Sequence, residues 1–197
     1  MSSISAHKFG VALPQFLICR KMTEKVNVPQ GSHIVNALIS TQDTRALISF
    51  LEKVFDAQED KNALAISQSD GKIFNSSITI GDTTIIIFDR KEGWKHTPSL
   101  LQVYVNDIDR KLATAESLGA TIVTQPTDFY GGKLARFIDP QGNLWWLFEL
   151  SEYDESDWFS EETAEETDAV WALEPDSDMT YIHDSLVESM KKLNDFQ

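Results

Sequence analysis

The 197-residue chain has one cysteine, Cys19, and four histidines. A single cysteine excludes an intrachain disulfide and favours a reducing compartment, so we interpret Cys19 as a small apolar filler rather than a reactive thiol. The histidines are scattered, with no close pair on one predicted element, and the histidines alone therefore predict no metal site. They are His7, His33, His96 and His183.

Long apolar runs are also missing. No run approaches the roughly 18 residues that a membrane helix needs, and no typical secretion signal is found, so we expect a cytoplasmic protein without a membrane partner. Glycine-rich phosphate loops and a nucleophile-elbow motif are absent too.

Basic residues are few, with 17 Lys and Arg against 31 Asp and Glu and a net charge of −14. Binding to nucleic acid requires a basic face, so this balance argues against a nucleic-acid partner. The acidity is concentrated in residues 137–197, which hold 17 acids and two bases, whereas residues 1–136 are nearly neutral. This shift indicates a boundary near residue 151.

One pattern of elements occurs twice along the chain. Residues 40–57 carry an apolar helical stripe, with Asp43 or Thr44 as N-cap, between strand candidates at 33–40, 62–68, 72–80 and 83–89. The pattern returns with strand 100–105, helix 106–119 and strands 120–126, 133–139 and 143–150, about 64 residues later when Asp43 is matched to Asp107. The fold class predicted is α+β: two βαβββ units sharing one core.

The second unit carries three short motifs in a fixed order. Residues 105–109 read V-x-D-x-D, residues 130–133 read Tyr-Gly-Gly-Lys, and residues 139–145 read D-P-x-G-x-x-W. Over residues 32–150 the chain resembles the vicinal-oxygen-chelate superfamily (glyoxalase I, bleomycin-resistance proteins, extradiol dioxygenases), and within it the phosphonate-operon-type, glyoxalase-like branch. The resemblance implies cupped, mainly antiparallel sheets, a ligand in the concavity and a homodimer.

In metal-dependent relatives the resemblance places His, Glu or Gln on the first and last strand of each unit. Here those positions hold Asn36, a residue between 84 and 86, Leu100 (or Gln102 after a register slip of two) and Trp146. An indole cannot bind a metal as a ligand, so we predict no metal and no other cofactor. A divalent metal is the alternative if the register is wrong.

Strand alternation places the adjacent Trp145 and Trp146 on opposite faces. Trp145 is expected under the helices, and Trp146 in the cup with Leu144 and Phe148. There Trp146 either fills a collapsed cup or stacks against an organic ligand, and both interpretations stay open. The predicted ligand-binding residues are Asn36, Gln102, Tyr130, Lys133 and Trp146, although a plain hairpin turn also explains the Gly131-Gly132 pair.

We predict three segments: an N-terminal extension over 1–31, the glyoxalase-like domain over 32–150, and an acidic extension over 151–197. The extension ends in an amphipathic helix at about 178–194, whose stripe must bury on its own domain or on a partner. The stripe consists of Met179, Ile182, Leu186, Met190 and Leu193.

The function expected is metal-free binding of a small organic molecule, as in bleomycin-resistance proteins, and no catalytic residue is identified. The alternatives are a metal-dependent lyase, isomerase or dioxygenase, and an interaction protein that acts through its acidic tail.

Overall fold

The computed structural model describes residues 27–28, 33–129, 131–150 and 177–193. The chain divides into two units, residues 1–34 and 35–197, and all that follows concerns the second. The predicted N-terminal extension lies outside the described residues except for positions 27 and 28.

The first module has one helix and a mixed sheet in which β1 runs parallel to β5 and the other pairs are antiparallel. The sheet order is β1-β5-β4-β2, with β3 pairing to β4. Most of the strand expected at 62–68 is instead a 3-10 turn and a two-residue strand, because the Asp60 side chain caps the turn. The elements are β1 (Ala37–Thr41), α1 (Thr44–Phe55), β2 (Gln58–Glu59), η1 (Lys61–Ala63), β3 (Ala65–Ile66), β4 (Ile73–Ile80) and β5 (Thr83–Asp89).

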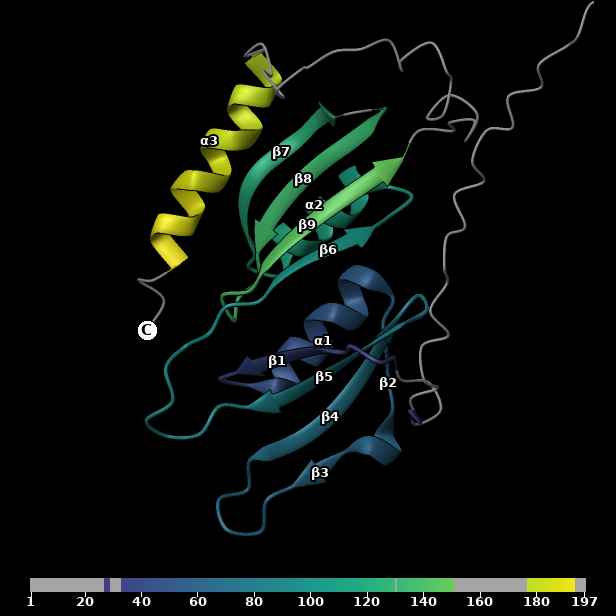
Figure 1. Cartoon of the computed structure of the whole chain (residues 1–197), viewed down its shortest axis with the longest axis vertical. Coiled ribbons are helices and arrows are strands. Elements are labelled where there is room, and N and C mark those ends of the chain that lie inside the picture. The colour runs from purple at the N-terminus through teal and green to yellow at the C-terminus, as the bar shows by residue number, and fades with distance from the viewer. Residues whose placement is uncertain (1–26, 29–32, 130, 151–176, 194–197) are drawn as a thin grey trace, which may run out of the picture. The chain divides into compact units, whose positions relative to one another are not determined.

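The second module repeats this topology, with sheet order β6-β9-β8-β7 and a parallel β6–β9 pair (Figure 1). The predicted α+β class with two βαβββ units is therefore confirmed. Gly119, with a φ of 92°, follows the second helix in the left-handed conformation that glycine commonly adopts at a helix C-terminus. The elements are β6 (Leu100–Tyr104), α2 (Ile108–Ser117), β7 (Thr121–Phe129), β8 (Gly132–Ile138) and β9 (Leu144–Leu150).

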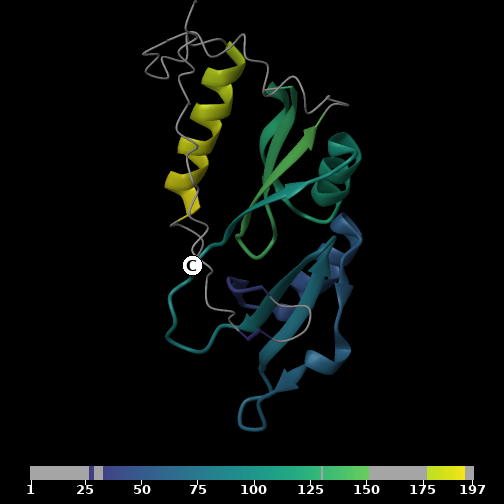
Figure 2. The same cartoon turned by 45° about the vertical axis from the view of Figure 1, so that its right-hand side comes forward.

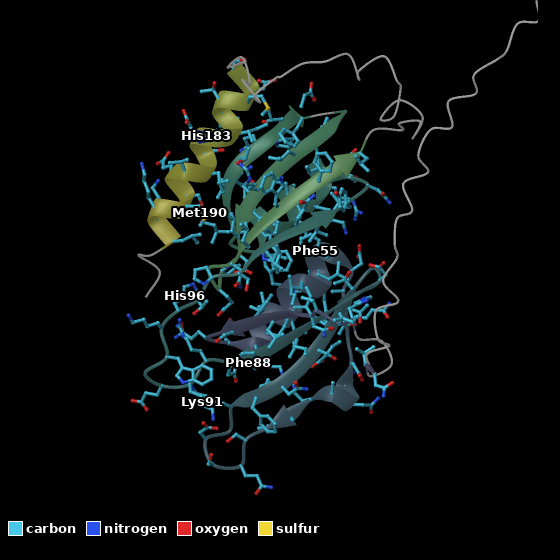
Figure 3. The ribbon with its side chains drawn as sticks, viewed as in Figure 1. Phe55, Phe88, Lys91, His96, His183 and Met190 are labelled. Carbon is cyan, nitrogen blue, oxygen red and sulfur yellow. The ribbon has the colours of Figure 1, made fainter. Side chains whose placement is uncertain are left out.

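The two modules share one hydrophobic core, built from both helices and one face of each sheet. The apolar stripe predicted on α1 is buried in it, as are Ile108, Leu112 and Ala115 of the second helix. Phe55 of α1 lies between the modules (Figure 3), with its ring centroid 5.1 Å from that of Trp145 on β9. Phe50 reaches Phe137 of β8 at 5.8 Å. The prediction that the duplicated units share a core is confirmed.

A carboxylate near the end of each module's last strand anchors that module's helix. Asp89 accepts a hydrogen bond from the backbone N–H of Thr44 at 2.8 Å, and Glu149 accepts one from Ile108 at 2.7 Å. Helix N-termini favour negative charge, so each carboxylate stabilises the start of its module's helix in the same way. Glu149 is thereby held on the helix side of its sheet.

Helix α3 (Ser177–Lys192) packs on its own chain and runs beside β7 (Figures 1 and 2). The predicted stripe is confirmed for four of its members, Met179, Ile182, Leu186 and Leu193, which lie in the contact with the sheet. It is wrong for Met190, which is 44% exposed, because Ser189 takes the inward position. No helix in the described part of the chain is long and apolar enough to span a membrane.

Candidate functional site

The Asp-Pro-Gln-Gly corner between β8 and β9 sets the start of β9. The carboxylate of Asp139 accepts hydrogen bonds from Gln141 N, from Asn143 and from the indole Nε1 of Trp145, the last at 2.8 Å. Burial raises the pKa of Asp139, while these bonds act in the opposite direction. Gln141 also accepts a bond from Thr41 Oγ1 at 2.9 Å, which ties the corner to the first module.

The two adjacent tryptophans face opposite ways, as strand alternation predicts. Trp145 is fully buried in the shared core, and its indole N–H is used by Asp139. Trp146 is half-buried on the opposite face of the same sheet. We call this side, which turns away from α1 and α2, the outer face. It carries Leu134, Arg136, Ile138, Leu144, Trp146 and Phe148 on β8 and β9.

Helix α3 covers the part of the outer face that lies toward β7. Ile182 packs with Leu134 and Phe148, and Trp146 and Met179 border the same cluster. Farther along the helix, Leu193 packs with Ile138 and Leu144. Trp146 thus lies at the margin of a face that the chain partly covers with its own C-terminal helix.

The part of the outer face on β6 is open. Gln102 is paired in register with Trp146 and is exposed, and Tyr104, paired with Phe148, is 64% exposed. Leu100, at the start of the same strand, is also exposed. An amide, a phenol and an aliphatic side chain therefore line the uncovered side of the indole.

Arg136 is a functional candidate that the sequence reasoning missed. Its guanidinium carbon lies 3.9 Å from the centroid of the Trp146 ring, and the residue is 1% exposed. Its Nη1 donates to the carbonyl of Ile182 at 2.7 Å and more weakly to Thr124 Oγ1. The sequence does contain a signal for it. Side chains alternate along β8, so Arg136 lies on the same face as Leu134 and Ile138, and a cation between two apolar residues is unusual.

The structure does not bring Asn36 or Lys133 together with Trp146. Lys133 lies on the opposite face of β8, where its Nζ is 3.6 Å from Asp109 of α2. Asn36 directly precedes β1 in the other sheet, so the shared core separates it from Trp146. Tyr130 falls outside the described residues.

The outer face does not fit a divalent metal. Among the described residues no group of three or more His, Cys, Asp or Glu side chains could hold an ion. Of the expected ligand positions, only Gln102 places a donor beside Trp146. The buried guanidinium of Arg136 stands on the same face and would repel a second cation.

Two hollows lie near the site but not over Trp146. A groove of about 430 Å³ runs between β6 and the first module and is lined by Gln102, Tyr104 and Lys111 among others. Lys111 is paired there with Asp56 at 2.6 Å, which lowers the pKa of that carboxyl. A polar hollow of about 530 Å³ is lined by Arg90 and His96, and burial, together with the charge of Arg90, lowers the pKa of His96.

Three mycobacterial proteins are similar to this chain in sequence. An uncharacterized protein of Mycobacterium bovis is 30% identical over 117 residues, covering 53% of this chain and 75% of that protein. Uncharacterized proteins of two Mycobacterium tuberculosis strains are also 30% identical over 117 residues, covering 53% of this chain and 67% of each of them.

Solved structures to which the chain is similar include TioX from Micromonospora sp. ML1, with 20% identity and a TM-score of 0.46 over 59% of this chain and 99% of that chain. The fosfomycin resistance protein FosX from Mesorhizobium loti has 17% identity and a TM-score of 0.45 over 65% and 98%.

The sequence profile of one family matches residues 32–147, which is more than half of the chain and covers both βαβββ units except for the last three residues of β9. The chain therefore belongs to the Glyoxalase/Bleomycin resistance protein/Dioxygenase superfamily.

Proposed function

We propose that this protein binds a small organic molecule on the outer face of its four-stranded sheet and does so without a metal. The observation that carries the proposal is the half-buried indole of Trp146 beside the exposed side chains of Gln102 and Tyr104. An aromatic contact with this indole contributes about 0.5–1.5 kcal/mol beyond area burial. The amide of Gln102 supplies both a donor and an acceptor to a polar group.

Within the superfamily, we propose the phosphonate-operon-type, glyoxalase-like branch, with sequestration in the manner of bleomycin-resistance proteins as the mode of action. The support is the order of the motifs over 105–109, 130–133 and 139–145. The described strand positions of the outer face hold no carboxylate or imidazole, and this favours binding over acid–base catalysis. The acidic-tail hypothesis falls on residues 151–176, outside the described part of the chain.

We also propose a homodimer. A ligand that contacts both Asn36 and Trp146 needs a second copy, because the shared core separates these two side chains within one chain. Leu38, Leu100 and Tyr104 leave apolar surface exposed along the edge strands β1 and β6, which a second copy would cover. A particle mass near the 22.2 kDa of one chain in sedimentation equilibrium would contradict the proposal.

The purified protein is expected to carry no stoichiometric zinc, nickel, iron or manganese. The reason is that the expected ligand positions hold Asn36, Leu100 and Trp146, which do not form a donor set. Elemental analysis of protein prepared without chelator measures this directly. Near-equimolar metal that disappears in Gln102→Ala would show that the ligand register was assigned wrongly.

Binding of an organic compound is expected to depend on Trp146. A thermal-shift screen of metal-stripped protein would identify compounds, and calorimetry would then compare wild type with Trp146→Ala. We expect affinity to fall by about tenfold, in line with the loss of a stacked aromatic contact and part of its buried area.

The matched control is Trp94→Ala, because Trp94 is half exposed on the loop between β5 and β6. Its replacement is expected to leave the affinity unchanged. Equal losses in the two variants would mean that the compounds bind aromatic surface without preference for the outer face.

A further inference from the structure

Arg136 is a buried cation without an anionic partner among the described residues. Its contacts are the face of Trp146, the neutral carbonyl of Ile182 and the hydroxyl of Thr124. Its Nε is buried and has no hydrogen-bond partner in the part of the chain that the structure describes. Burying a guanidinium is costly unless its N–H groups are matched by acceptors, and here the match is incomplete.

The contact that covers Arg136 is polar at its centre. Ser185 of α3 bonds to Thr124 of β7, with 2.8 Å between their hydroxyl oxygens. Ser189 is buried, and no described residue is a hydrogen-bond partner of its hydroxyl. Of the five buried side-chain atoms without a partner in the described residues, two belong to this contact. Ile182 and Leu193 are buried in the same contact, and Met179 and Leu186 are partly buried beside them, so apolar packing flanks this polar centre.

The guanidinium is therefore incompletely matched, and the contact that covers it is polar at its centre. We propose that Arg136 is an anion-binding centre on the outer face and that α3 is a displaceable cover over it. The ligand it would take is an organic anion, such as a carboxylate, attached to a flat apolar body. This inference rests on the proposed function and adds to it the charge of the ligand and a means of admitting it.

Arg136 gains stronger hydrogen bonds when an anionic ligand replaces α3. In the covered form the guanidinium donates to the neutral carbonyl of Ile182. An anionic ligand replaces this acceptor with charged oxygens that accept two parallel N–H bonds, which are stronger than bonds to a neutral carbonyl. The apolar body then rests against Trp146 and the exposed ring of Tyr104. Burial lowers the pKa of Arg136 to about 10, so the side chain is still cationic at neutral pH.

The proximity of Thr124 and Ser185 allows the cover to be locked in the full-length protein. With 2.8 Å between the two hydroxyl oxygens, cysteines at these positions come within reach of a disulfide. The variant is Thr124→Cys with Ser185→Cys, made together with Cys19→Ser so that no other thiol is present. The reduced form of the same protein is the matched control for any effect of the substitutions on folding.

The probes are 2-naphthoate and its neutral counterpart 2-naphthalenemethanol, with binding measured by calorimetry. We expect the reduced variant and the wild type to bind 2-naphthoate more tightly than the alcohol. Disulfide formation is expected to weaken 2-naphthoate binding by at least about tenfold, as when a charged hydrogen bond is lost. Reduction should restore it.

A second variant, Arg136→Met, tests the anion centre separately from the cover. We expect it to lose the preference for 2-naphthoate over the alcohol while its midpoint of chemical denaturation stays the same or rises, because a buried charge without an anionic partner is removed. The unchanged midpoint distinguishes a binding role from a purely structural one.

Equal affinity of the disulfide-locked and reduced forms for 2-naphthoate would overturn the proposal that α3 is a displaceable cover. Binding of 2-naphthoate that survives Arg136→Met, or no binding to the reduced form at millimolar concentration, would overturn the anion centre. The proposed function is judged separately with the neutral alcohol. If its binding is lost in Trp146→Ala, the proposed function stands without this inference.

Discussion

Trp145→Ala is expected to lower the free energy of unfolding by about 3–5 kcal/mol, the range for truncating a fully buried tryptophan. Trp145 is 0% exposed, lies 5.1 Å from Phe55 between ring centroids, and donates its indole N–H to Asp139. The substitution removes this ring contact between the modules and leaves a buried carboxylate with one donor fewer. Chemical denaturation measures the loss.

Trp146→Ala is the matched comparison, since the same side chain is removed one residue along the same strand. We expect about half that loss or less, because Trp146 is only half-buried and part of the vacated volume is open to solvent. Loss of the contact with Arg136 contributes about 0.5–2 kcal/mol of it. A larger loss for Trp146→Ala than for Trp145→Ala would make Trp146 a core residue, and the binding site would then have to lie elsewhere.

Asp139→Ala is expected to cost about 3–5 kcal/mol, since each buried donor left unpaired costs about 1–3 kcal/mol. The carboxylate accepts bonds from Gln141, Asn143 and Trp145, so its removal leaves the corner and the start of β9 without their common acceptor. Asp139→Asn is the control, because it keeps the size of the side chain and one acceptor oxygen. Urea denaturation of both variants should show the smaller loss for Asn.

The direction of the pKa shift of Asp139 predicts how the difference in stability between wild type and Asp139→Asn depends on pH. Burial raises the pKa of Asp139 in the folded state, so the folded protein holds this proton more tightly than the unfolded chain does. The stability contributed by Asp139 is therefore fully present below its ordinary pKa of 3.8 and declines as pH rises through the raised value. We expect the difference in unfolding free energy between wild type and Asp139→Asn to be larger at acid pH than at neutral pH. A difference that grows toward neutral pH would mean that the ionised carboxylate is the favoured form.

The fold could be predicted because its signals are local. The apolar stripe of α1 has helical spacing, and Trp145 and Trp146 alternate as neighbours in any strand do. Asp43, one of the two N-cap candidates for the first helix, occupies that N-cap position. Each of these predictions depends on residues within a few positions of one another, and each was confirmed.

The site was harder to predict because it depends on contacts that are distant in sequence. Alternation assigns Asn36 and Trp146 to sheet faces, but it does not show that the helices of both modules lie between those faces. The acceptor for Arg136 is the carbonyl of Ile182, 46 residues away, and no local pattern indicates it. Met190 was placed on the buried stripe because it is apolar, although the inward position belongs to Ser189. A small polar residue at a buried position gives no hydrophobic signal.

The most direct test of the central claim is an NMR titration. The tryptophan indoles of the protein are labelled with ¹⁵N, and a compound from the thermal-shift screen is added stepwise. Substituting each tryptophan by phenylalanine assigns the indole N–H signals. We predict that the Trp146 signal shifts with the same midpoint that calorimetry gives, while the Trp145 signal, held by Asp139 in the core, changes little. Binding that is seen by calorimetry but leaves the Trp146 signal unmoved would contradict a ligand site on the outer face.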